Sequence, residues 1–138
     1  MTTTPQAAQG ARAPEALEAR FVELALARDL DGIVGLYAAD AVVSLPLGRE
    51  AAGHVAIRAA FAAALAAEAL GPFDGAVLSR AVVAGDLAMT TSSCSDGSVR
   101  TQVARRTSDG RWVWVRDGSR LRGVPACLPV DSAPLAVA

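Results

Sequence analysis

The sequence predicts an α+β fold in which three N-terminal helices pack on a curved antiparallel sheet. Two observations lead to this prediction. In the first half of the chain, up to about residue 68, apolar residues recur at helical spacing in three segments. In the second half, short alternating segments are separated by Gly-Asp or Asp-Gly pairs, which favour antiparallel hairpins. With 138 residues, the chain is long enough for one domain with a single core.

Each of the three expected helices has its own start or stop signal. The first spans residues 14–28 and begins at Pro14, because the first helical turn tolerates a missing N–H. Asp29 can cap a second, short helix that ends near Tyr37. The third runs over about 54–68, before Gly71-Pro72. The apolar positions of the three helices are Leu17, Phe21, Leu24 and Leu26; Ile33, Val34, Leu36 and Tyr37; and Ile57, Phe61 and Leu65.

Five strands are expected from β-branched segments and turn residues. The first, at 41–45, follows a turn at Ala39-Asp40 and ends at a Pro46-x-Gly48 corner. The other four, at 75–84, 87–95, 99–107 and 111–119, should form an antiparallel meander. Residues 1–13 resemble a disordered leader and 122–138 an extended or disordered tail, so the expected domain is 14–121.

Composition excludes several classes of protein. The 13 basic and 14 acidic residues nearly cancel and form no basic stripe, so a nucleic-acid partner is not expected. The longest apolar run, 59–67, is too short to cross a bilayer, and the N-terminus lacks the pattern of a signal peptide. Cys94 and Cys127 fit neither metal spacing nor a disulfide framework, which indicates reduced thiols and a cytoplasmic location.

Several motifs resemble the nuclear transport factor 2-like (NTF2-like) superfamily. They are DLDGIVGLYAADA at 29–41, Pro46-x-Gly48, Gly53, AIR at 56–58, VAGD at 83–86 and DGRW at 109–112. The resemblance covers about residues 15–120 and is closest to SnoaL-like cyclases and small accessory proteins of polyketide and enediyne biosynthesis. It implies a cone whose sheet wraps around a ligand-binding cavity and whose outer face forms a homodimer.

Ketosteroid isomerases of the same superfamily match closely around Asp29 to Gly48, yet their chemistry is not expected here. That reaction needs a carboxylate base and an oxyanion hole of acidic donors. The resemblance places the base position on Leu45 and the donor positions on Phe21 and near Val103, while Phe61 replaces a supporting tyrosine. These apolar side chains cannot transfer a proton.

Strand alternation and the resemblance together predict which residues line the cavity. If the last strand keeps the family's orientation, Asp117 points inward, and Trp112 and Trp114 lie on the opposite face, where they suit a dimer interface. The expected ligand-binding residues are Phe21, Tyr37, Ser44, Leu45, Phe61, Thr90, Ser92, Cys94, Val103, Arg105, Val113 and Val115.

Asp117 is the candidate catalytic residue, because it is the one carboxylate that this pattern places in the cone. It would act as a general acid or base, with Arg105 as a partner; alternatively it only starts the turn at 117–119. Tyr37 could donate to a ligand oxygen or be a core tyrosine. Ser44 and Cys94 are expected to line the pocket rather than act as nucleophiles.

No metal or cofactor is predicted, because the single histidine, His54, has no second ligand at suitable spacing and is expected at the surface. The sequence therefore predicts a small-molecule binding or tailoring protein of polyketide type that holds an apolar or aromatic metabolite. If it is an enzyme, the resemblance implies SnoaL-like cyclase or related acid/base chemistry. Two alternatives stay open. One is a non-catalytic dimeric scaffold whose side chains fill the cavity. The other is an epoxide hydrolase, whose acid–arginine–acid set Asp117 and Arg105 supply only in part.

Overall fold

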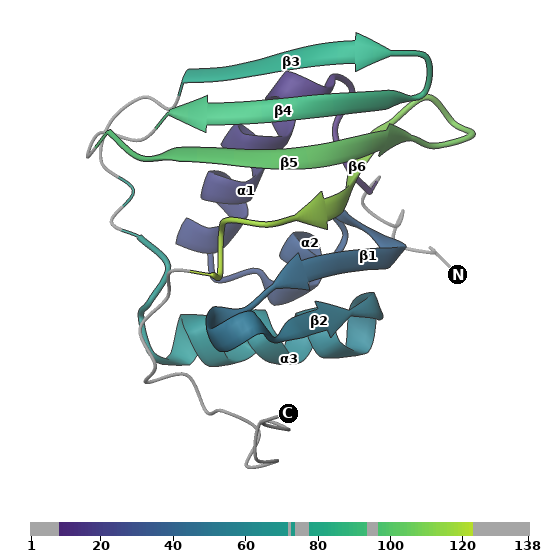
Figure 1. Ribbon diagram of the computed structural model, residues 1–138. Coiled ribbons are helices and arrows are strands. Elements are labelled where there is room, and N and C mark those ends of the chain that lie inside the picture. Colours follow the sequence, from purple (N-terminus) through teal and green to yellow (C-terminus); the bar gives the residue numbers. More distant parts are fainter. Residues whose placement is uncertain (1–8, 72, 74–77, 94–96, 123–138) are drawn as a thin grey trace.

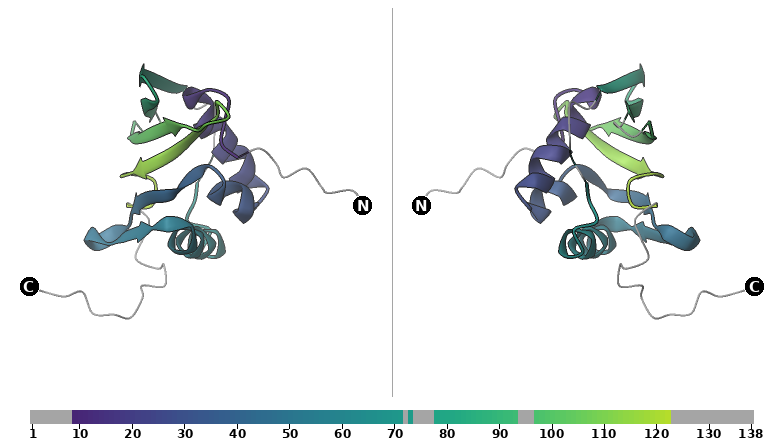
Figure 2. Two further views of the ribbon diagram at one scale, coloured as in Figure 1. Left: turned by 90° about the vertical axis from the view of Figure 1, so that its right-hand side faces the viewer. Right: turned by 90° about the vertical axis from the view of Figure 1, so that its left-hand side faces the viewer.

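Three helices cover one side of a single six-stranded sheet, which confirms the α+β prediction (Figures 1 and 2). The structure is a computed structural model that describes residues 9–71, 73, 78–93 and 97–122. Its helices are α1 (Leu17–Leu26), α2 (Leu30–Val34) and α3 (Gly53–Ala66), with short 3-10 turns at Pro14–Ala16 and Pro46–Gly48. Its strands are β1 (Tyr37–Ser44), β2 (Glu50–Ala52), β3 (Leu78–Ala84), β4 (Leu87–Ser93), β5 (Val99–Arg106) and β6 (Trp112–Asp117).

The strand order is β2-β1-β6-β5-β4-β3. Strands β3 to β6 form the predicted antiparallel meander, and Gly85 and Gly110 supply positive φ angles of 62° and 81° in its turns. Strand β1 differs from the expectation, because it lies parallel to β6. The chain then returns through β2, a strand that is too short for its sequence pattern to reveal. The parallel pair places the first strand beside the last one in the middle of the sheet.

The junction of α2 and β1 lies earlier in the chain than predicted. Asp29 caps α2 as expected, since its Oδ1 accepts from the backbone N–H of Gly32 at 2.9 Å. The helix ends at Val34, however, and Tyr37 is already the first residue of β1, so the predicted turn at Ala39-Asp40 is wrong. The strand begins early because Tyr37 already pairs with Trp114 of β6, while Ala39 and Asp40 lie in the irregular stretch of this pairing between Tyr37 and Val42.

Residues 9–13, expected in the disordered leader, are held against the sheet. Ala11 and Trp112 exchange two backbone hydrogen bonds of 3.0 and 2.7 Å, and Gly10 donates to the carbonyl of Gly35 at 3.1 Å. A Cβ atom at Gly10 would lie only 2.2 Å from the Trp112 carbonyl oxygen, and φ is +76°, so this position requires glycine. The rest of the expected leader and the expected tail from 123 onward lie outside the described residues.

A β-bulge in β6 decides which side chains of the last two strands face the helices. Gln102 pairs with Asp117 and Ala104 pairs with Trp114, so three positions on β5 correspond to four on β6. The extra residue is Val115, which has no partner in the register. A bulge of this kind shifts, by one residue, the alternation of side chains between the two faces of the sheet. Trp114 and Asp117 therefore share the inner face with Gln102 and Ala104, and all four are at most 1% exposed.

Two orientation predictions are consequently wrong. On β5, Gln102 and Ala104 are the inner residues, while Val103 is half-buried and Arg105 lies on the outside. Arg105 forms an exposed ion pair of 2.8 Å with Asp40 and lies away from Asp117. On β6, Trp112 and Trp114 are 6% and 0% exposed, so neither is available to a dimer interface. No helix in the described part of the chain is long and apolar enough to span a membrane.

Candidate functional site

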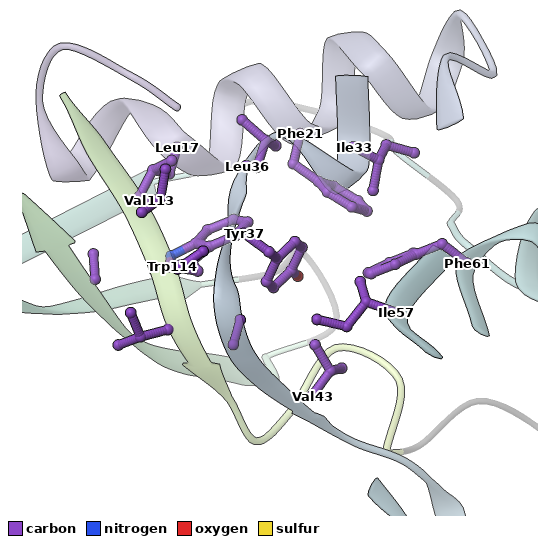
Figure 3. Packing of buried hydrophobic residues seen from close by; sticks show 14 of the residues in the cluster. Leu17, Phe21, Ile33, Leu36, Tyr37, Val43, Ile57, Phe61, Val113 and Trp114 are labelled. Atoms are coloured by element: carbon purple, nitrogen blue, oxygen red, sulfur yellow. The ribbon is translucent and has the colours of Figure 1, made fainter. Parts of the chain in front are cut away.

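Aromatic rings fill the space between the helices and the sheet (Figure 3). Phe21 of α1, Tyr37 of β1, Phe61 of α3 and Trp114 of β6 contact one another, with ring centroids 5.4–6.4 Å apart. Phe73 packs edge-on against Phe21 at 6.3 Å. We call these five residues the aromatic cluster. It brings together Phe21, Tyr37 and Phe61, three of the predicted ligand-binding residues, and each of the three is at most 1% exposed.

A chain of buried polar groups lies against this cluster. The hydroxyl of Tyr37 donates to Asp117 Oδ2 at 2.7 Å. The other carboxylate oxygen, Oδ1, accepts from the backbone N–H groups of Ser119 and Arg120 at 3.2 and 3.1 Å. Asp117 is 1% exposed, and it lies on the inner face of the sheet together with Trp114. Its carboxylate caps the turn after β6, which was the alternative to a catalytic role in the sequence analysis. The same carboxylate also accepts from Tyr37.

Arg120 joins Asp117 to a second buried acid. Its Nη2 donates to Glu18 Oε1, and its Nε lies 3.8 Å from Asp117 Oδ2. The guanidinium also lies 3.7 Å from the ring centroid of Phe21, a cation–π geometry. Ser92 Oγ donates to Glu18 Oε1 at 3.4 Å. We call Glu18, Tyr37, Ser92, Asp117 and Arg120 the buried polar network.

The shifted pKa values of two members of this network indicate their charge states. Burial raises the pKa of Tyr37 well above its ordinary value, and the neighbouring Asp117 raises it further, so the phenol stays neutral and donates. Burial is the largest single influence on the pKa of Arg120 and would lower it, but the neighbouring Glu18, Tyr37 and Asp117 together outweigh burial and the pKa is raised. The guanidinium therefore stays charged. Two buried carboxyl groups thus face one permanent cation.

The raised pKa of Tyr37 gives a direct test, because this is the only tyrosine in the chain. An alkaline titration followed by tyrosinate absorbance is expected to show no ionisation of the folded protein near pH 10, the ordinary value. The neutral phenol stabilises the fold fully below this pH. Above it the unfolded state loses the proton first, and stability falls by about 1.4 kcal/mol per pH unit until the folded pKa is reached. A reversible midpoint near the ordinary value in folded protein would contradict the burial of Tyr37.

The other predicted ligand-binding residues are spread over different surroundings. Thr90 and Ser92 face the helices and are 3% and 1% exposed, as their strand parity predicted. Ser44 and Leu45 are half-buried at the end of β1. Val113 is buried against the N-terminal segment, since a Cβ at Gly10 would lie 2.9 Å from its Cγ1, and Val115 is buried at the bulge. Cys94 lies outside the described residues.

His54 is half-buried, and its Nε2 lies 2.7 Å from the backbone carbonyl oxygen of Tyr37. It lines an outer pocket of about 470 Å³ together with residues of α1, α2, α3 and the N-terminal segment, among them Arg20, Asp31 and Arg58. The pocket is separate from the buried polar network. Among the described residues no group of three or more His, Cys, Asp or Glu side chains could hold a metal ion.

Sequence reasoning missed Glu18, Gln102 and Arg120. A signal existed for Glu18, which lies three positions before Phe21 and seven before Ala25, and so shares their buried helix face. Gln102 was missed because the predicted inner positions on β5, 101, 103 and 105, are each one residue away from the true ones, 102 and 104. Arg120 lies beyond the end of the last strand, where no periodic pattern indicates that a side chain folds back inward.

Comparisons with known proteins agree with this architecture. A family model described as a SnoaL-like domain matches residues 19–124. No curated protein matches the chain. A similar solved structure is an NTF2-like protein with a cystatin-like fold from Novosphingobium aromaticivorans. It is 25% identical, with a TM-score of 0.55, and the match covers 83% of this chain and 82% of that one.

Two more distant structures show the same fold. A protein of unknown function from Mycobacterium tuberculosis is 21% identical with a TM-score of 0.53; the match covers 75% of this chain but spans only 66% of that protein's length. A putative ketosteroid isomerase from Shewanella frigidimarina is 16% identical with a TM-score of 0.55, covering 80% of this chain and 98% of that one. At these identities the likeness concerns the fold alone.

Proposed function

Because the chain belongs to the family of SnoaL-like domains within the NTF2-like superfamily, we propose that it binds or tailors a small molecule of polyketide type, enediyne intermediates included, inside its cone. The observation that carries the proposal is the buried polar network beside the aromatic cluster. An apolar or aromatic metabolite would pack on the rings, and Asp117 with Tyr37 would supply the polar contacts. A cytoplasmic location is part of the same proposal.

Energetics support a functional role for the network. A buried set of ionised groups stabilises a protein less than apolar side chains of the same volume would. Buried acids in a ring-lined interior are therefore a frequent mark of an acid/base or binding site. Asp117 combines both requirements, since it is buried and its Oδ2 contacts the neutral phenol of Tyr37. The proposed chemistry is general acid/base catalysis by Asp117, as in a SnoaL-like cyclase, and not steroid isomerisation.

A non-catalytic scaffold is the competing function, and the filled aromatic cluster also suits it. A ligand-binding experiment distinguishes the scaffold from the small-molecule binding protein. Apolar aromatic ketones and polyketide intermediates, tested near their solubility limits, are expected to raise the melting temperature; a ligand at 100 times its Kd adds about 2.7 kcal/mol of stability. A Trp112→Phe protein leaves Trp114 as the only tryptophan, so the same ligands should quench its fluorescence.

The matched Trp114→Phe protein, which keeps only Trp112 near the N-terminal segment, should show the melting shift with little quenching. A panel that produces neither a melting shift nor quenching in any of the proteins would contradict the proposed function and favour the scaffold.

The outer face of the sheet supports the homodimer that the family resemblance implied, through residues other than the tryptophans. Val82, Met89 and Val103 lie opposite one another across β3, β4 and β5, on the face turned away from the helices. Exposed apolar residues of this outer face, with exposures of 51–75%, are Leu78, Val82, Leu87, Met89 and Val99. Such a patch on one sheet face is typical of a protein interface.

We therefore expect the protein to be a dimer that Met89→Asp converts to a monomer, because the new charge would lie unpaired in the interface. Sedimentation velocity measures the change. Val55→Asp is the control, since Val55 is 88% exposed on α3 and lies off the patch. A monomeric wild-type protein at micromolar concentration would contradict the dimer.

Epoxide hydrolysis is a second candidate, and the position of Arg120 favours it. The sequence offered only Asp117 and Arg105, but the structure places Arg120 between Asp117 and a second acid, Glu18. In such a reaction one carboxylate takes a proton from water, the water oxygen bonds to an epoxide carbon, and a second acid protonates the opened oxygen. Styrene oxide in ¹⁸O-labelled water should then give a diol with one labelled oxygen. Absence of this turnover would remove the candidate.

A further inference from the structure

The outer pocket of about 470 Å³ takes no part in the chemistry proposed for the cone. Four parts of the chain form its walls, namely residues 9–10, α1, α2 with its flanking residues, and the first turns of α3. Leu24, Val34 and Leu36 are buried and give it an apolar part of its lining. Small-molecule sites commonly have volumes of about 300–1,000 Å³ and combine an apolar lining with a few polar groups. The polar residues of the lining therefore decide what this pocket can bind.

Two glycines that line the pocket, Gly32 and Gly35, differ in why they lack a side chain. At Gly32 a Cβ atom would lie 2.5 Å from Leu24 Cδ2, so packing excludes a larger residue. At Gly35 the backbone has φ −66° and ψ −11°, and a Cβ atom would meet nothing closer than 3.4 Å. Stability alone would favour alanine at this position, because its conformation suits any residue. Glycine at position 35 instead leaves the pocket open.

His54 contributes an imidazole ring whose hydrogen-bonding state is defined. Its Nε2 lies 2.7 Å from the backbone carbonyl oxygen of Tyr37. A carbonyl oxygen can only accept, so Nε2 carries a proton, and Nδ1 of the neutral ring is an acceptor. His54 is half-buried in the pocket lining, which leaves Nδ1 to accept from a ligand in place of water.

The charged residues of the lining offer donors and acceptors side by side and carry no net charge. Arg20 and Arg58 supply two guanidinium groups, and Asp29 and Asp31 supply two carboxylates. Arg58 Nη2 donates to Asp31 Oδ1, and the side chains of this pair are 48% and 82% exposed. The other N–H groups of Arg58 and the second oxygen of Asp31 are therefore accessible next to each other.

This arrangement restricts the class of ligand. A simple anion would meet the two carboxylates as well as the arginines, and a simple cation would meet the two guanidinium groups, so neither gains much from the charges. A hydroxyl group both donates and accepts. Neighbouring hydroxyl groups of one neutral molecule can thus donate to Asp31 and accept from Arg58 at the same time.

We propose that the outer pocket is a second ligand site, distinct from the cone, which binds a neutral polyhydroxylated molecule such as a monosaccharide. Asp31 and Arg58 hold two neighbouring hydroxyl groups, and His54 Nδ1 accepts from a third. The C–H groups of the ligand pack on the apolar part of the lining. The site goes beyond the proposed function, because none of these residues belongs to the aromatic cluster or to the buried polar network.

Nuclear magnetic resonance reads this site directly, since His54 is the only histidine in the chain. The probes are myo-inositol and a panel of monosaccharides, compared with cyclohexanecarboxylate as the anion and cyclohexylammonium as the cation. The imidazole signals of ¹⁵N-labelled protein are expected to shift saturably with at least one neutral polyol. At the same concentrations the anion and the cation should leave these signals in place.

Three variants complete the test. Arg58→Met removes an exposed ion pair, so it should fold normally and bind the polyol about tenfold more weakly. Gly35→Leu fills the pocket and should abolish the shift. Arg106→Met, the same change in an exposed arginine paired with Asp86, should bind like wild type. A panel without a saturable shift, a preference for the anion or the cation, or an undiminished shift in Gly35→Leu would overturn the inference and leave the proposed function standing.

Discussion

Replacing Arg120 by methionine is expected to lower the free energy of unfolding by about 3–5 kcal/mol, because it leaves a buried acid without its cation. Arg120 is 4% exposed, and its partner Glu18 is 2% exposed. The arginine also packs its guanidinium on Phe21, so the substitution removes that contact as well. Equilibrium urea unfolding at neutral pH, followed by circular dichroism, measures the loss.

The control is Arg105→Met, which makes the same chemical change in an arginine that was expected at the site. The Arg105–Asp40 pair is exposed, so its removal should hardly move the urea midpoint. A Glu18→Gln/Arg120→Met double variant should be more stable than Arg120→Met alone, because the stranded acid is gone. If Arg120→Met unfolded at the wild-type urea concentration, the buried ion pair would not exist in solution.

Replacing Asp117 by asparagine is expected to reduce catalysis by a factor of about 10²–10⁴, the usual contribution of one general acid or base. The fold should survive, since the amide oxygen can still accept from the N–H groups of Ser119 and Arg120. The substrate is obtained by deleting the gene and identifying the intermediate that accumulates. Its conversion by purified wild-type and variant protein is then compared.

Asp40→Asn is the matched control, because Asp40 is an exposed aspartate on the outer side of the sheet whose pKa is lowered by its hydrogen bond to Arg105. It should convert the intermediate at the wild-type rate. Full activity of Asp117→Asn would exclude acid/base catalysis by this residue and leave a binding role. An unchanged product yield in the deletion strain would contradict a pathway function altogether.

The fold could be predicted because its signals are local. Asp29 as a cap, apolar residues at helical spacing in α1 and α3, and Gly-Asp or Asp-Gly pairs between strands each act within a few residues, and the structure contains each of these elements. The early start of β1 could not be predicted in this way. Tyr37 is extended because of β6, a strand that lies 75 positions further along the chain.

The site could be predicted only in part, for a similar reason. Asp117 faces inward as expected, but the residue that balances its charge is Arg120 rather than Arg105. Trp114 was predicted on the outer face but lies on the inner one, and the unpaired residue Val115 is the reason. Side chains alternate regularly between the two faces of a sheet only where each residue of one strand has one partner on the next. A bulge has no reliable signature in a single sequence.

The ion pair of Glu18 and Arg120 also has a consequence for how the chain is made. The two residues are 102 positions apart, so the ribosome synthesises Glu18 long before Arg120. Until Arg120 is available, α1 cannot bury its inner face without burying an unpaired charge. Long-range closure of this kind makes folding slow and cooperative. We therefore expect the buried polar network to form only when the sheet is completed by β6 and the turn after it.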